Sequence, residues 1–119
     1  MRLCPTKSTT STATDSALGE AAAIKYFASL GWSVSLPCRG DSPYDLVADD
    51  GDRLYRVQVK TSRSRRFRLQ HRCRTGWRDY PAGTVDLFAC YSPELDRVEI
   101  ISAEDAARNV YFDTLPAAR

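Results

Sequence analysis

Two segments that favour β-strands, residues 44–48 and 54–60, stand on either side of the tetrapeptide Asp49-Asp50-Gly51-Asp52. Gly and Asp in such a connection permit the backbone conformations of a tight hairpin turn. The pattern therefore predicts two antiparallel strands joined by a hairpin. This pair constrains the fold most, because the alternation of side chains along each strand then decides which residues share a face of the sheet.

Polar side chains stand at positions of this hairpin where apolar ones are expected. Along residues 54–60 the alternation places Gln58 and Lys60 together on a polar face, opposite an apolar one. Asp45 opens the other strand, which is otherwise apolar. Pairing around the turn brings Asp45 close to Gln58 and Lys60. We therefore expect a carboxylate, an amide oxygen and an ammonium group at one end of the sheet.

These three groups suit the hydrolysis of phosphodiesters. Hard divalent cations such as Mg²⁺ bind oxygen ligands, usually one or two carboxylates completed by water and phosphate oxygens, and Asp45 meets that need. Lys60 can position or deprotonate the attacking water, or neutralise the charge that develops on the phosphate. The alternative interpretation is a structural Asp at a turn, beside a Gln and a Lys on a solvated face of the sheet.

A helix is predicted over residues 17–30 by its alanine content, and Gly31 follows it at the position where helices commonly end. Within this helix Glu20, Ile24 and Phe27 share one stripe. An acid on an apolar stripe is unusual for a residue that serves only solubility. Glu20 is therefore of functional interest, unless its carboxylate simply reaches water at the edge of the stripe.

Residues 1–14 contain seven Ser or Thr residues and no apolar periodicity, so we expect a disordered tail there, followed by a single domain over residues 15–119. A mixed sheet with flanking helices is expected in this domain, which is an α/β sandwich. The other predicted elements are strands at residues 32–36, 85–91 and 97–101 and a short helix at residues 103–109, which follows a capping-box pattern.

The net charge of +2 conceals a strong segregation of charge. Residues 60–78, the basic segment, carry eight basic residues and no acidic one, whereas the rest of the chain has a net charge of −6. Arg predominates in this segment and aromatic residues are interleaved, which favours binding of nucleic acid over a merely solvated loop. The expected DNA-binding residues are Arg63, Arg65, Arg66, Arg68, Arg72, Arg74 and Arg78.

Cysteine spacing and hydropathy exclude several classes of protein. The four cysteines form no CxxC pair and the chain has one His, so a zinc site is not expected, and the thiols are typical of a reduced, cytoplasmic protein. The longest apolar run, residues 87–91, is five residues, far below the roughly 20 that cross a bilayer. We expect neither a membrane span nor a secretory signal.

Four short motifs carry a resemblance to a known family. They are Gly19-Glu20, Tyr44-Asp45, Gln58-Val59-Lys60 and Val85-Asp86-Leu87-Phe88. Together they resemble the PD-(D/E)XK nuclease superfamily, and most of all its group I intron-associated homing endonucleases, in which Gln replaces the second acid. The similarity covers most of the chain from residue 15 to residue 101.

The resemblance implies a restriction-endonuclease-like core with the order α-β-β-β-α-β and a site with four members. Glu20 and Asp45 would hold Mg²⁺ or Mn²⁺, Gln58 would take the second-acid position, and Lys60 would be the catalytic lysine. The basic segment shows no apolar helical stripe where the family has its second core helix. We expect the basic segment to replace that helix.

The sequence therefore predicts a metal-dependent DNA endonuclease, of homing or restriction type or resembling a junction resolvase. Two alternatives stay open. A non-catalytic nucleic-acid-binding module could keep the fold and lose metal binding through Gln58. An interaction protein could use the basic segment to bind an acidic protein.

Assembly is expected because one site per chain hydrolyses one strand, so cutting a duplex needs at least two copies. We predict a homodimer or homotetramer. The alternative is that the apolar C-terminal residues fold onto their own core. The residues proposed for the contact are Val98, Ile100, Ile101, Val110, Tyr111, Phe112 and Leu115.

Overall fold

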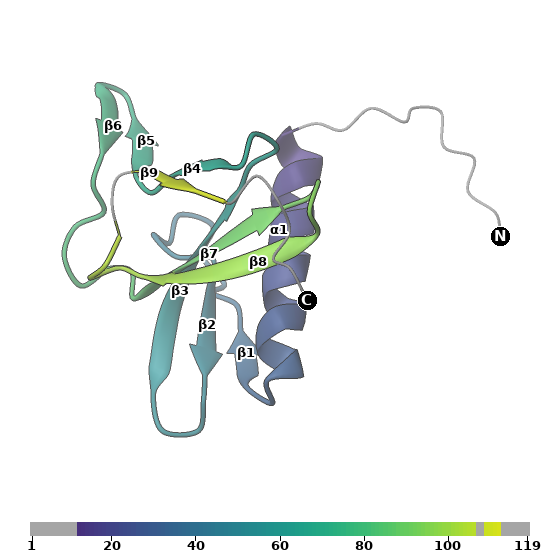
Figure 1. Cartoon of the computed structure of the whole chain (residues 1–119). Coiled ribbons are helices and arrows are strands. Elements are labelled where there is room, and N and C mark those ends of the chain that lie inside the picture. The colour runs from purple at the N-terminus through teal and green to yellow at the C-terminus, as the bar shows by residue number, and fades with distance from the viewer. Residues whose placement is uncertain (1–11, 107–108, 113–119) are drawn as a thin grey trace, which may run out of the picture.

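The computed structural model describes residues 12–106 and 109–112, and it consists of one helix and nine strands in that part of the chain (Figure 1). Five strands form a central sheet in the order β1-β2-β3-β7-β8, and the other four form two small two-stranded sheets, β4-β9 and β5-β6. The elements are α1 (Thr12–Ser29), β1 (Ser33–Ser35), β2 (Leu46–Asp49), β3 (Leu54–Thr61), β4 (Arg66–Arg68), β5 (His71–Cys73), β6 (Gly76–Arg78), β7 (Leu87–Ser92), β8 (Arg97–Ser102) and β9 (Asn109–Tyr111).

The central sheet is mixed, which confirms the predicted fold class. Strands β2 and β3 pair antiparallel with Leu46 opposite Val57, so the predicted hairpin forms in the expected register. Strand β7 lies parallel to β3 and antiparallel to β8. The alternating side chains of β7 enter two separate cores: Leu87 and Ala89 belong to one, and Phe88 and Cys90 to the other.

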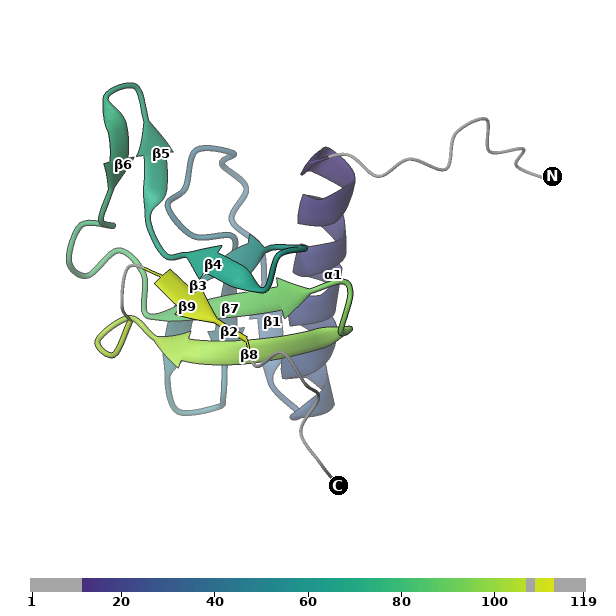
Figure 2. The ribbon, with the colours of Figure 1, turned by 45° about the horizontal axis from the view of Figure 1, so that its top comes forward.

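One core lies between the sheet and α1, and the other lies on the opposite face of the sheet. The helix contributes Ala23 and Phe27 to the first core, against Leu46 and Val57 of the hairpin. In the second core the ring of Phe67 on β4 lies 4.6 Å from that of Phe112, which directly follows β9. Figure 2 shows β4 and β9 lying across the sheet.

The end of α1 follows directly from its sequence. Gly31 has a φ of 83°, a left-handed conformation that glycine adopts without steric cost. Its N–H donates to the carbonyl of Ala28, and the N–H of Trp32 donates to the carbonyl of Phe27. This is a Schellman motif, and the stacking of Trp32 on Phe27, with ring centroids 5.4 Å apart, supplies the hydrophobic contact that accompanies it.

The N-terminal boundary differs from the prediction. The helix includes residues 12–14, which the composition predicts as part of the disordered tail, so the ordered domain begins before Asp15. Thr and Ser are weak helix formers, and composition alone therefore predicts a helix start that is too late. The remainder of the predicted tail, residues 1–11, lies outside the described residues. No helix in the described part of the chain is long and apolar enough to cross a membrane.

The predicted helix at residues 103–109 is wrong. Ser102 is the last residue of β8, and its hydroxyl accepts a hydrogen bond from the N–H of Glu104 within a short turn. The chain then pairs through β9 with the edge of β4. A local capping pattern cannot reveal this pairing, because the partner strand lies about forty residues earlier. The described residues therefore contain one helix, not several flanking helices.

The basic segment continues β3 and then forms β4 and the β5–β6 hairpin. Residues 66–68 of this segment form the short strand β4, with Phe67 buried. The β5–β6 hairpin projects from the body of the molecule at the end opposite the β2–β3 turn (Figure 1). The basic segment thus forms strands where the family resemblance implies a second helix. The absence of an apolar helical stripe in its sequence predicted this replacement.

Candidate active site

Asp45 lies where β2 separates from β3. Its N–H donates to the carbonyl of Val57 at 2.8 Å, and its carboxylate Oδ2 accepts the N–H of Val59 at the same distance. Strand β2 begins only at the next residue, Leu46, so its side of β3 has no strand beyond this point. The carboxylate thus takes the place of a neighbouring strand, and two backbone hydrogen bonds fix its orientation.

A cavity of about 330 Å³ opens at this point between α1 and β3. It brings together three of the four predicted site residues, Glu20, Asp45 and Gln58. Glu20 comes from the helix and the other two from the hairpin. The remaining lining residues are Thr12, Asp15, Ser16, Val59 and Thr61.

Gly19 allows the helix to approach the sheet closely enough to form this cavity. A Cβ atom at this position would lie 1.9 Å from Oγ1 of Thr61 and 3.2 Å from Cγ1 of Val59. Gly19 is buried in the structure. The absence of a side chain therefore sets the distance from which the next residue, Glu20, reaches the cavity.

The two carboxylates of the cavity are held in an unfavourable electrostatic setting. Burial raises the pKa of Glu20, and the charge of Asp45 raises it further. Burial also raises the pKa of Asp45, although the N–H of Val59 and the charge of Lys60 oppose the rise. Within the described residues the side chains of Glu20 and Gln58 make no hydrogen bond or ion pair. A cation between these oxygens would relieve the repulsion.

The donor set fits Mg²⁺ or Mn²⁺ better than a softer metal. No group of three or more His, Cys, Asp or Glu side chains in the described part of the chain could hold a metal. Asp15 also lines the cavity, but Arg63 binds its carboxylate through Nη2 at 2.9 Å. Glu20, Asp45 and the amide oxygen of Gln58 remain. Mg²⁺ typically binds through one or two carboxylates, with water and phosphate oxygens as its other ligands.

Lys60 lies beside this cavity, and its ammonium is bound by residues that do not line the cavity. Its Nζ donates to the backbone carbonyl of Gln70 at 3.0 Å and to the hydroxyl of Tyr80 at 2.8 Å. The ammonium also lies 5.0 Å from the centre of the Tyr80 ring. Burial lowers the pKa of Lys60 to about 8, against the charges of Asp45 and Cys90. All four predicted site residues thus lie in one region.

Sequence reasoning missed the roles of Gly19, Gln70 and Tyr80. Tyr80 follows Lys60 by twenty residues across an irregular path, and Gln70 acts through its main chain, which leaves no signal in the sequence. The one available signal is Gly19, a glycine within an otherwise alanine-rich helix, because a glycine at such a position often marks a close approach of backbones.

The predicted DNA-binding arginines fall into two groups. Arg63 and Arg65 form ion pairs with Asp15 and Glu94, so they are engaged within the molecule. Trp77, which is 42% exposed, has two guanidinium groups close to its ring, with carbon atoms 4.5 Å (Arg68) and 5.5 Å (Arg72) from the ring centre. The exposed residues of the β5–β6 hairpin are Arg72, Arg74, Thr75, Trp77 and Arg78. Arg66 is exposed on β4.

A second cavity, of about 590 Å³, contains none of the four predicted site residues. It lies beside the loop at residues 79–83 and the turn that follows β8. Its walls mix apolar side chains with acidic and basic ones, and Asp86 on its lining is already bound by Arg56. The oxygen-rich cavity at Asp45 is therefore the candidate active site.

Comparison with known proteins identifies the family of the chain. A family model described as PD-(D/E)XK endonuclease matches residues 10–117. The chain belongs to the PD-(D/E)XK endonuclease family. This confirms the resemblance inferred from the four motifs. Comparison with the curated proteins finds no match.

Among solved structures, the chain of this PD-(D/E)XK family member is similar to that of a bacterial homing endonuclease, I-Ssp6803I. The TM-score is 0.68 and the sequence identity is 22%, over 92% of this chain and 80% of the other. At that identity the likeness shows that the two proteins share a fold.

Proposed function

We propose that the protein is a metal-dependent DNA endonuclease that hydrolyses phosphodiester bonds. The observation that carries this proposal is the convergence of Glu20, Asp45 and Gln58 on one cavity, with the ammonium of Lys60 beside it. Family membership supports nuclease activity in general. The exposed arginines of the β5–β6 hairpin support a polyanionic substrate.

Glu20, Asp45 and the amide oxygen of Gln58 are the groups that would hold Mg²⁺ or Mn²⁺. When bound, the cation polarises the scissile phosphate and lowers the pKa of a water molecule. Asp45 presents its remaining lone pairs in a fixed direction, because the N–H of Val59 already occupies one oxygen. The cavity is lined by oxygen donors and leaves room for water and a phosphate group.

Lys60 acts on the phosphate and on proton transfer. Its ammonium is positioned to neutralise the charge that develops as the attacking oxygen bonds to phosphorus. Because its pKa is lowered to about 8, a fraction of the lysine is neutral at slightly alkaline pH and can accept a proton from water. The arginines of the hairpin bind the phosphates on either side, which positions the substrate without reading its sequence.

The test compares variants that remove charge and keep shape. In Asp45→Asn the amide oxygen can still accept the N–H of Val59, so the fold is retained while the carboxylate is lost. We expect Asp45→Asn and Lys60→Met to reduce Mg²⁺-dependent cleavage of plasmid and branched DNA by about 10²- to 10⁴-fold. DNA affinity, measured in EDTA, should change little because the arginines are intact.

Asp41→Asn and Lys25→Met are the matched controls, since Asp41 pairs with Arg39 on the surface and Lys25 is exposed. Both should cleave at the parent rate. Cleavage at the parent rate by Asp45→Asn or Lys60→Met, or cleavage by the parent in EDTA, contradicts the proposal. A parent that binds DNA and cleaves none favours the non-catalytic module, and one that binds no DNA favours an acidic protein partner.

A further inference from the structure

The β5–β6 hairpin joins the body of the protein through two short stems. Gln70 directly precedes β5, and Asp79 and Tyr80 directly follow β6. The side-chain Nε2 of Gln70 donates to Oδ1 of Asp79 at 2.8 Å, which ties the two stems together. Gln70 is only 6% exposed, whereas Asp79 lies on the surface, so the bond joins a buried stem to an exposed one.

Both stems also bind the ammonium of Lys60. The carbonyl of Gln70 accepts one N–H and the hydroxyl of Tyr80 accepts another, at 3.0 and 2.8 Å. An ammonium group has three N–H donors, so the hairpin base occupies two of them and directs the third. The ammonium lies 5.0 Å from the centre of the Tyr80 ring.

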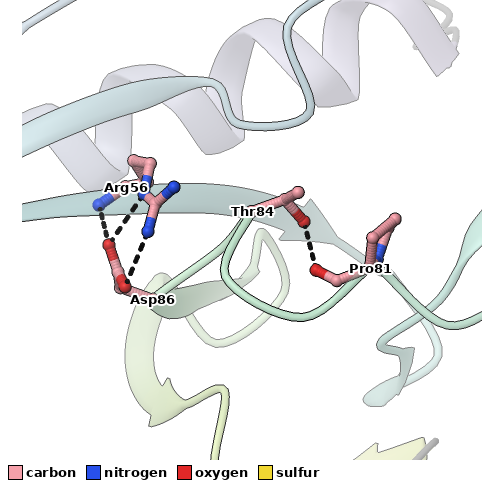
Figure 3. Close-up of polar contacts among 4 residues, drawn as sticks. All are labelled: Arg56, Pro81, Thr84 and Asp86. Carbon is pink, nitrogen blue, oxygen red and sulfur yellow. Dashed lines mark hydrogen bonds and ion pairs between the residues drawn. The ribbon is translucent and has the colours of Figure 1, made fainter.

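Tyr80 contacts the hairpin itself, and the segment that follows Tyr80 is fixed to the central sheet. The ring of His71, the first residue of β5, lies 5.1 Å from that of Tyr80. After Tyr80 the chain turns through a bond from the Thr84 hydroxyl to the carbonyl of Pro81, and Asp86 then binds the N–H and guanidinium of Arg56 on β3 (Figure 3). Tyr80 therefore contacts the first residue of the hairpin and begins the segment that leads to the contact with β3.

We propose that Gln70, Asp79 and Tyr80 form a clamp that positions Lys60 and couples it to the β5–β6 hairpin. The proposal rests on the function proposed above. DNA that binds the exposed arginines of the hairpin is thereby linked, through the two stems, to the lysine that acts on the phosphate. Tyr80 and Asp79 are positioning residues, because they act through Lys60.

Three variants separate positioning from folding. Tyr80→Phe keeps the ring and removes only the hydroxyl that holds the lysine. Asp79→Ala opens the tie between the stems, whereas Asp79→Asn keeps an oxygen that can accept from Gln70. The matched control is Tyr91→Phe, which removes a hydroxyl bond of the same length, 2.8 Å to Asp96, in the β7–β8 hairpin.

We expect Tyr80→Phe and Asp79→Ala to lower the single-turnover cleavage rate at saturating DNA by about 10- to 100-fold, as misplacement of a catalytic group by about 1 Å does. Their affinity for the same DNA in EDTA and their melting temperatures should stay close to those of the parent. Asp79→Asn should restore most of the rate. Tyr91→Phe should cleave as the parent does.

A spectroscopic readout reports on Lys60 without cleavage. The chain has three lysines, so the ε-methylene protons of Lys60 can be assigned by NMR through Lys60→Arg. In the parent the two protons should differ in chemical shift, because the clamp holds them near the Tyr80 ring. The difference should shrink in Tyr80→Phe and Asp79→Ala and persist in Tyr91→Phe and Asp79→Asn.

The outcomes distinguish this proposal from the function on which it rests. If the parent cleaves and Tyr80→Phe cleaves equally fast, the clamp has no positioning role, and the proposed function stands. Unchanged ε-methylene shifts in Tyr80→Phe and Asp79→Ala contradict the clamp in the same way. If the parent cleaves no DNA, both proposals fail together.

Discussion

Gly19 shows how a single residue shapes the candidate site. Glycine inside a helix costs about 1 kcal/mol relative to alanine, because it loses more backbone freedom on folding. At this position the cost is accepted because any Cβ would collide with Thr61 on β3. The glycine lets the helix pack closely against the strand. Glu20, the next residue, then faces Asp45 across the cavity. The position of Glu20 therefore depends on the absence of a side chain at residue 19.

Asp86 makes stability depend on pH. Burial alone raises its pKa, but the hydrogen bonds and charge of Arg56 outweigh burial and lower the pKa below its ordinary value. A carboxyl with a lowered folded-state pKa stabilises the protein above the unfolded-state pKa of about 3.9, and this contribution is lost as the pH falls through the folded-state value. Asp86→Asn should therefore unfold at lower urea than the parent at pH 7.

The difference in free energy of unfolding between parent and Asp86→Asn should narrow as the pH falls below about 4 and through the lowered folded-state pKa, because the parent carboxyl then becomes neutral too. Urea unfolding followed by tryptophan fluorescence measures it. Asp41→Asn is the control, because its partner Arg39 lies on the surface and the side chains are 69% and 78% exposed. Such an exposed ion pair contributes little to the free energy of unfolding. If the difference in free energy of unfolding seen at pH 7 is unchanged at pH 3, the effect comes from the shape of the side chain and not from its charge.

At the scale of elements, the β5–β6 hairpin should supply much of the DNA affinity. Its three exposed arginines, Arg72, Arg74 and Arg78, make no ion pair within the part of the chain that the structure describes. Replacing all three by Gln should weaken binding to unrelated DNA sequences alike. The slope of log K against log salt should fall in magnitude by about 0.9 for each DNA phosphate that the variant no longer neutralises.

Arg39 and Arg53 provide the matched control for this measurement. Both are exposed, and Arg53 lies in the β2–β3 turn, at the end of the molecule opposite the hairpin (Figure 1). Arg39→Gln with Arg53→Gln should leave the salt slope as it is. Arg65 is a poor test residue because Glu94 holds it. An unchanged slope in the hairpin variant would show that its arginines do not contact phosphate.

The elements also show what local sequence can and cannot predict. The β2–β3 hairpin and the end of α1 are determined by neighbouring residues, namely the alternation of apolar side chains and the glycine that ends the helix, so both predictions are confirmed. The pairing of β9 with β4 and the bonds of Lys60 to the hairpin base depend on residues ten to forty positions apart. No local pattern carries that information.

At the scale of the whole molecule, the surface expected for assembly belongs mostly to the chain's own core. Val98 and Ile100 pack toward α1, Ile101 packs on the other face, and Phe112 is only 4% exposed against Phe67. Phe112→Asp would therefore unfold the protein and cannot test assembly. Tyr111, which is 67% exposed, is the usable position. Val110 and Leu115 lie among residues whose side chains the structure does not describe.

We still predict a homodimer or homotetramer, because each chain carries one candidate site and a duplex has two strands to cut. Multi-angle light scattering at micromolar concentration should give a multiple of the chain mass of 13.3 kDa, with and without DNA in EDTA. On supercoiled plasmid, an assembly should produce linear product together with nicked circles, since two sites act on one duplex. Tyr111→Asp should shift the mass toward the monomer if this surface forms the contact. A parent that stays monomeric with and without DNA, and that accumulates only nicked circles, would show that the protein cuts one strand at a time as a single chain.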